Sequence, residues 1–224
     1  MMKRIGMILP VIVLAAMMLT VGCDTNSSNT PSIEKIDVAP TPEPPETKPV
    51  VIKTTKISRP VVVIETSMGT ITAELWADSA PVTVKNFLDY AKAKHFDGLV
   101  FHRVIQGFMI QGGGFDAKMR QKETRDQIPN EATIDKKNDR GTLAMARTSI
   151  VDSASSQFFI NLKDNDALNH RARTTRDFGY CAFGKVIDGM DVVDKIATVP
   201  VADRGGHQSV PITPVIIKSV RLAK

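Results

Sequence analysis

The sequence predicts a mainly β domain in which an antiparallel sheet closes on itself. The observations behind this fold class are short apolar strand patterns separated by turn residues, and only two segments with helical spacing. Closure is expected because it removes exposed strand edges. About 165 residues follow position 58, enough for one buried core. Residues 59–224 are therefore predicted to be one domain, without an internal boundary or repeat.

The first elements of this domain are two strands and a helix. Residues 61–66 and 70–76 have strand composition and flank a Met-Gly turn, which predicts a hairpin. Pro81 stands in the first turn of a predicted helix, in which apolar side chains recur every three or four residues through Ala91. Further short strands follow, interrupted only by a second helical pattern over residues 190–196.

The first 22 residues predict an export signal. Two basic residues precede an apolar run that ends at Val21, and a Gly-Cys pair follows. This ending resembles a bacterial lipoprotein signal, which implies that residues 1–22 are removed and that Cys23 is lipidated. Thr20 departs from that motif, which usually has Leu there. An uncleaved transmembrane anchor is the alternative, but the run is short for a span and contains Pro10.

Residues 23–58 are predicted to be the lipidated cysteine and a disordered, proline-rich tether. Six prolines stand among polar residues in this segment, and such a composition buries too little surface to offset the entropy of ordering. Proline-rich chains extend by ~3.1 Å per residue, so the tether could hold the domain up to on the order of 100 Å from a bilayer. The expected location is the bacterial cell envelope, with the domain on the periplasmic, extracytoplasmic side.

Residues 101–114, with the sequence FHRVIQGFMIQGGG, carry more chemistry than a structural hairpin needs. Side chains alternate between the two faces of a strand. Alternation predicts that Phe101, Arg103 and Ile105 share one face and that His102 points the other way. His102 is therefore interpreted as a packing residue, not as an acid or base.

Gly107 permits a turn between two strands of this segment. The side chains expected to form an apolar recess with one charge and one amide at its rim are Arg103, Phe108, Met109 and Gln111. The glycine run 112–114 could cradle a phosphate, but it lacks the Lys-Ser/Thr of a P-loop and the strand-turn-helix setting of a dinucleotide site.

Four ordered segments resemble the cyclophilin family of peptidyl-prolyl cis-trans isomerases, in particular its bacterial branch. They are residues 101–114, 141–148 (GTLAMART), 155–161 (SSQFFIN) and 183–190 (FGKVIDGM). The resemblance covers residues 59–224. It implies an eight-stranded antiparallel β-barrel capped at each end by an α-helix, acting on proline-containing polypeptides.

Isomerisation requires no nucleophile, metal or cofactor, because no bond is made or broken. The catalyst has to bind the twisted amide better than either planar form. Twisting makes the imide nitrogen more basic, so a fixed guanidinium that donates to it gains strength as the twist develops. Arg103 matches the family's catalytic arginine.

The resemblance also assigns substrate-binding positions, and each would be unremarkable alone, as a core or solvated side chain. They are Phe108, Met109, Gln111, Ala146, Arg147, Gln157, Phe159, Leu168 and Tyr180. Arg147 stands where many relatives have Asn, and Tyr180 where many have His. Ala167 stands where eukaryotic members carry a Trp important for cyclosporin binding, which implies weak cyclosporin affinity.

Two other function classes are weighed against an isomerase that helps exported proteins fold. A non-catalytic module that binds proline segments as a chaperone or scaffold would not need Arg103. A lipocalin-like ligand barrel fits poorly, because the inward positions are filled with apolar side chains.

The formal net charge of +5 comes partly from the basic loop 169–177, and without interleaved aromatic residues it does not indicate nucleic-acid binding. A monomer is expected, and Cys181 is interpreted as a buried strand thiol.

Overall fold

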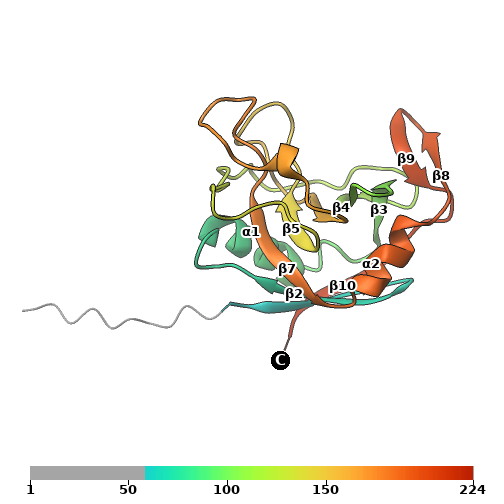
Figure 1. The fold of residues 1–224 in the computed structure, drawn as a ribbon. Coiled ribbons are helices and arrows are strands. Elements are labelled where there is room, and N and C mark those ends of the chain that lie inside the picture. The colour runs from blue at the N-terminus through green and yellow to red at the C-terminus, as the bar shows by residue number, and fades with distance from the viewer. Residues whose placement is uncertain (1–58, 224) are drawn as a thin grey trace, which may run out of the picture. The chain divides into compact units, whose positions relative to one another are not determined.

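The structure is a computed structural model that describes residues 59–223. It contains ten strands, two α-helices and one short 3-10 helix (Figure 1). In chain order they are β1 (Val61–Thr66), β2 (Gly69–Leu75), α1 (Pro81–Lys92), β3 (Leu99–Ile105), β4 (Met109–Asp116), β5 (Thr142–Met145), β6 (Phe158–Asn161), the 3-10 helix η1 (Asp166–Leu168), β7 (Ala182–Asp188), α2 (Met190–Ala197), β8 (Val201–Arg204), β9 (His207–Pro211) and β10 (Ile217–Leu222).

Eight of these strands form one antiparallel sheet in the order β10-β1-β2-β7-β5-β6-β4-β3. Its two outer strands, β10 and β3, approach each other. Two backbone hydrogen bonds show this: the Phe101 N–H donates to the Val215 carbonyl and the Gly98 N–H to the Ile217 carbonyl, both at 2.9 Å. The sheet is thereby a nearly closed barrel, as the sequence predicts. The remaining two strands, β8 and β9, form a separate hairpin in which β8 is exposed and β9 ends in buried residues, and the sequence patterns do not predict it.

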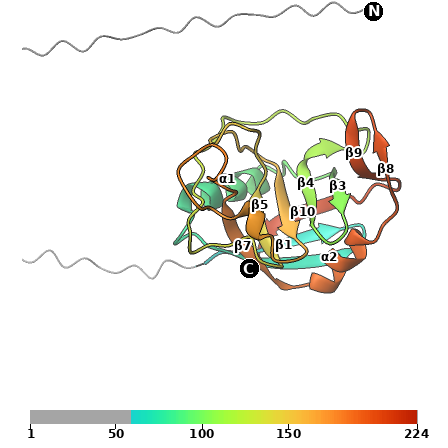
Figure 2. The same cartoon turned by 45° about the horizontal axis from the view of Figure 1, so that its top comes forward.

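The barrel interior is filled with apolar side chains, and the two helices close its ends. Phe87 of α1 contacts Phe158 of β6 edge-on, with ring centroids 5.4 Å apart. Val193 and Ile196 of α2 are fully buried in the same core. The two helices lie at opposite ends of the barrel in both views (Figures 1 and 2). This filling leaves the interior to packing and places any binding site on the outside of the barrel.

The predicted element boundaries agree closely with the structure. The first strand is found at the predicted residues, and the second begins and ends one residue earlier, at Gly69 and Leu75. Helix α1 begins at Pro81, because a proline there loses no hydrogen bond. Helix α2 follows Gly189, which has a φ of 82°. A Cβ at this position would overlap the Thr70 carbonyl oxygen, so only glycine fits here.

The predictions for the export signal, the lipidated Cys23 and the tether concern residues 1–58, which lie outside the described residues. Within residues 59–223, no helix has both the length and the apolar character needed to cross a membrane.

Candidate functional site

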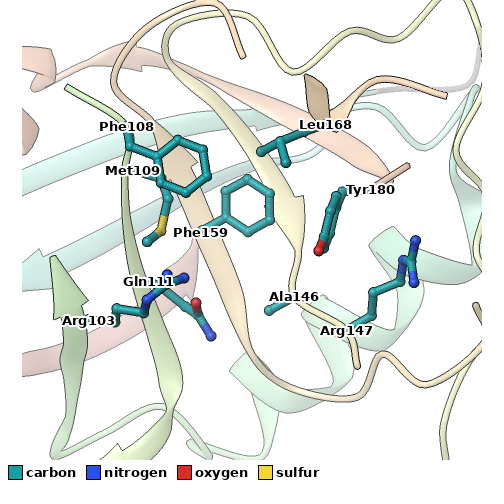
Figure 3. Close-up of a pocket in the computed structure, with 9 residues that line it drawn as sticks. All are labelled: Arg103, Phe108, Met109, Gln111, Ala146, Arg147, Phe159, Leu168 and Tyr180. Atoms are coloured by element: carbon teal, nitrogen blue, oxygen red, sulfur yellow. The ribbon is translucent and has the colours of Figure 1, made fainter. Parts of the chain in front are cut away.

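Three neighbouring strands bring an arginine, a glutamine and a phenylalanine into one row. Arg103 of β3 is the register partner of Gln111 of β4, and Gln111 is in turn the partner of Phe159 of β6. Residues in register across adjacent strands project from the same face of a sheet. Figure 3 shows the three side chains converging on one hollow.

A bulge in β3 corrects one prediction about this row. The register shifts between Phe101 and Arg103, so these residues do not share a face as strict alternation requires. Phe101 is fully buried in the barrel core, whereas Arg103 is only partly buried and faces the hollow. An extra residue in one strand reverses the side on which the following side chains project. Ile105, beyond the bulge, lies on the Arg103 side and packs against the residues of the hollow.

The hollow, called here the arginine recess, has a volume of about 120 Å³. Nine of the ten predicted catalytic and substrate-binding residues line it: Arg103, Phe108, Met109, Gln111, Ala146, Arg147, Phe159, Leu168 and Tyr180. Its floor is a small apolar cluster, separate from the barrel core, that is built on Met109, Ala144 and Phe159. The rings of Phe159 and Tyr180 meet edge-on at 5.7 Å. The recess therefore offers an apolar floor with a cation and an amide at one wall.

The tenth predicted residue, Gln157, lines an adjoining hollow of about 280 Å³, called here the polar recess. The Gln111 Nε2 donates to the Gln157 Oε1 at 2.9 Å, which holds the Gln111 amide in place between the two recesses. Gln111, Ala146 and Arg147 line both recesses. The two hollows therefore adjoin each other along these three residues.

The glycine run 112–114 lies in β4 and serves close packing. A Cβ on Gly113 would lie 2.9 Å from the Ser156 carbonyl oxygen, and one on Gly114 would lie 2.5 Å from the Gln157 Cγ. Gly114 thus leaves the space in which Gln157 lies against β4 and reaches Gln111. This packing accounts for the glycines without a phosphate.

The Arg103 guanidinium makes no ion pair and no side-chain hydrogen bond within residues 59–223. Its donors face the recess with no carboxylate to neutralise them. A charged donor held beside an apolar floor can stabilise a lone pair that develops on a bound ligand.

Buried asparagines support the backbone of the recess, a role that the sequence patterns do not predict. The Asn138 side chain donates to the carbonyl oxygens of Leu168 and Tyr180 at 3.0 and 3.1 Å. The Asn165 side chain donates to the Phe108 carbonyl at 2.9 Å and to the Asn161 Oδ1 at 2.7 Å. Three recess residues therefore have their backbones fixed by this network. The available signal was the amide Asn161, which ends an otherwise apolar strand pattern.

Two buried groups near the site are unsuited to proton transfer or nucleophilic attack. Burial lowers the pKa of the His102 imidazole to about 4, so the ring is neutral at physiological pH, in line with a packing role. Burial raises the pKa of the Cys181 thiol to about 12. The Cys181 Sγ lies 3.6 Å from the Thr83 Oγ1 in the interior, so the thiol is buried as expected, although Cys181 lies just before β7 and not within it.

Comparisons with known proteins match this geometry to one family. The sequence profile of the family described as "Cyclophilin type peptidyl-prolyl cis-trans isomerase/CLD" matches residues 61–222. Peptidyl-prolyl cis-trans isomerase B of Escherichia coli K12 is 52% identical over 164 residues, which cover 73% of this chain and 100% of that protein. A peptidyl-prolyl cis-trans isomerase of Acinetobacter baylyi is 54% identical over 166 residues, covering 74% of this chain and 87% of that protein.

Solved structures show the same likeness at lower identity. Two crystal structures of a Cryptosporidium parvum cyclophilin type isomerase match with TM-scores of 0.62 and 0.60, both at 29% identity. They cover 74% and 73% of this chain and 98% and 99% of theirs. The second was determined in the presence of the dipeptide Ala-Pro.

Proposed function

Since the chain belongs to the cyclophilin family of peptidyl-prolyl cis-trans isomerases, we propose that Arg103 drives rotation of X-Pro bonds by stabilising the twisted amide. The observation that carries this proposal is the convergence of Arg103 and Gln111 on an apolar floor. The prolyl ring would lie on that floor, with its imide nitrogen toward the guanidinium. The floor is of the right character for the Ala-Pro dipeptide used with the Cryptosporidium relative.

The chemistry required is a change of shape only. Rotation about a peptide bond faces a barrier of ~18–20 kcal/mol from the partial double bond. Arg103 would donate to the imide nitrogen once twisting has freed its lone pair, so the contact strengthens in the transition state. A hydrogen bond to a charged group contributes ~1.5–3 kcal/mol, equivalent to a rate factor of roughly 10 to 100.

Gln111 would hold the carbonyl of the residue that precedes proline. Its amide is already oriented by Gln157, so little ordering is needed when a substrate binds. The apolar floor fixes the ring while the carbonyl side turns.

The test of this proposal is isomerase turnover of the full chain on a proline tetrapeptide, compared with Arg103→Ala. We expect kcat to fall at least 10-fold while peptide affinity, measured by NMR titration, changes by less than threefold. Arg103→Lys keeps the charge but not the planar donor fork, so its kcat should lie between those of the parent protein and Arg103→Ala. Equal kcat values for Arg103→Ala and the parent protein would remove Arg103 from catalysis, and absence of turnover in both would favour the alternative, a non-catalytic module that binds proline segments.

The proposed setting is the cell envelope, where the enzyme would assist folding of exported proteins as a lipid-anchored monomer. The support is the signal-like sequence over residues 1–22, Cys23 and the proline-rich segment that follows. Cys23→Ala should move the protein from the membrane fraction to the soluble fraction and abolish incorporation of labelled fatty acid. Unchanged fractionation would favour the uncleaved anchor.

Weak cyclosporin binding is proposed from Ala167 in η1, an exposed position next to Leu168 of the recess. A small methyl group there offers the inhibitor little contact area. Ala167→Trp should tighten inhibition by about 10-fold or more, since a buried aromatic ring contributes ~2 kcal/mol. Nanomolar inhibition of the unaltered protein would contradict this expectation.

A further inference from the structure

We propose that Arg147 makes this isomerase prefer substrates with an acidic residue on the amino-terminal side of the proline. The inference rests on the proposed function, which places the proline in the arginine recess and the preceding carbonyl at Gln111. Because Gln111, Ala146 and Arg147 also line the polar recess, a chain leaving the proline past Gln111 runs over Ala146 and Arg147. The side chains before the proline then lie beside the Arg147 guanidinium.

The Arg147 guanidinium is fixed by neutral groups only. Its Nε donates to the Gly179 carbonyl and its Nη1 to the Thr148 carbonyl, both at 3.0 Å. The guanidinium carbon lies 4.9 Å from the centroid of the Tyr180 ring (Figure 3). Among residues 59–223, no carboxylate forms an ion pair with Arg147. A positive charge is therefore held in position at the rim without a neutralising partner.

The lining of the two recesses has cations but no anions. Arg103 and Arg147 are its charged residues, and the rest are apolar or neutral polar side chains. Residues 121–127 supply Gln121, Thr124 and Gln127 to the polar recess. The charged residues of this segment line neither hollow: Lys122, Glu123, Arg125 and Asp126. These arginines would therefore attract a carboxylate on a bound substrate and repel an ammonium group.

The expected preference is modest, because Arg147 remains partly exposed and solvent screens the interaction. Exposed charge pairs of this kind alter affinity by about two- to fivefold, and salt weakens them. Arg103 is needed for every substrate, whereas Arg147 would rank substrates by the charge before the proline.

The test uses the full chain with three blocked tetrapeptides, Ala-Xaa-Pro-Phe with Xaa as Glu, Gln or Lys, and a second set with the variable residue one position earlier. NMR exchange measurements give kcat/KM at low salt and at 0.5 M NaCl. In at least one set we expect kcat/KM for Glu to exceed that for Gln by about two- to fivefold, and Lys to fall below Gln by a similar factor. High salt should reduce both differences.

Two variants assign the preference to its source. Arg147→Gln should abolish the difference between the Glu and Lys peptides, and Arg147→Lys should keep part of it. Arg173→Gln is the matched control, because Arg173 lies on the neighbouring loop but lines neither recess, and it should keep the full preference. Equal kcat/KM values for the Glu, Gln and Lys peptides in both sets, measured on the unaltered protein, overturn the inference while leaving the proposed function intact. A preference that survives Arg147→Gln also overturns it, and absence of turnover on every peptide overturns both.

Discussion

Two hollows on the outside of the barrel differ in size and in chemistry. The arginine recess measures about 120 Å³ and combines an apolar floor with Arg103 and Gln111. The second, called here the apolar groove, measures about 580 Å³. Its lining comprises Ser67, Met68, Val199, Pro200, Ile212, Thr213, Pro214 and Val215.

Of these two hollows, only the smaller one holds the polar groups that the proposed mechanism needs. No charged or amide side chain lines the apolar groove, so it has nothing to offer an amide whose electronic structure changes during rotation. The arginine recess holds a directed cation beside an apolar surface, where charge interactions are stronger than in water. The comparison teaches that convergent polar groups, not volume, mark the candidate site.

The largest effect is expected from removing the recess floor. Phe159 is 4% exposed, and Phe159→Ala should lower the free energy of unfolding by about 3–5 kcal/mol through lost burial and a new cavity. Phe108→Ala is the control, because Phe108 is more exposed and should lose activity with a smaller cost in stability. Urea denaturation and isomerase assays check both. Full activity in both variants would remove the distinction between the two hollows.

Acid should weaken the fold through His102, which adjoins Arg103 of the arginine recess in β3. No titratable side chain lines the apolar groove, so no such effect is expected there. His102 has a pKa of about 4 in the folded protein against 6.5 for the free side chain, so the unfolded chain binds more protons between these values. The stability present above pH 6.5 is therefore lost as the pH falls toward 4, by on the order of 2–3 kcal/mol. His95 contributes in the same direction. Urea midpoints at pH 7 and pH 5 should differ less for His102→Gln; an unchanged difference would contradict this assignment.

Loss of the asparagine network should raise KM more than it lowers kcat. Asn138→Ala removes the donor to the Leu168 and Tyr180 carbonyls, and it should cost about 1–3 kcal/mol of stability. Because those carbonyls belong to residues of the recess wall, KM should rise by about threefold or more with kcat less affected. Steady-state kinetics on one tetrapeptide measure this, and a fall in kcat alone would count against a positioning role.

The smallest effect is expected in the apolar groove. Met68 is partly buried there, and Met68→Ala should change kcat/KM by less than twofold and stability by about 1 kcal/mol or less. A large loss of activity would show that the groove takes part in the reaction and would reverse the comparison.

Local patterns predicted most of the fold. The strand at residues 61–66 and the two helices follow from side-chain period, turn residues and Pro81. Long-range features did not follow. The bulge at His102 depends on pairing with β4, and the support of Tyr180 by Asn138 joins residues 42 positions apart. The recess residues could be named from the family resemblance, but their meeting requires the register of three strands.

The pairing of β1 with β10 places the start and the end of the barrel side by side. Val62 is the register partner of Leu222, and the Ala223 N–H donates to the Val61 carbonyl at 2.8 Å. A short loop could therefore join residue 223 to residue 59, with new ends opened at Gly205 and Gly206 in the exposed hairpin tip. Such a circular permutant would keep every strand of the barrel while moving both ends of the chain to the hairpin, which provides a site for attaching a reporter or a surface linker.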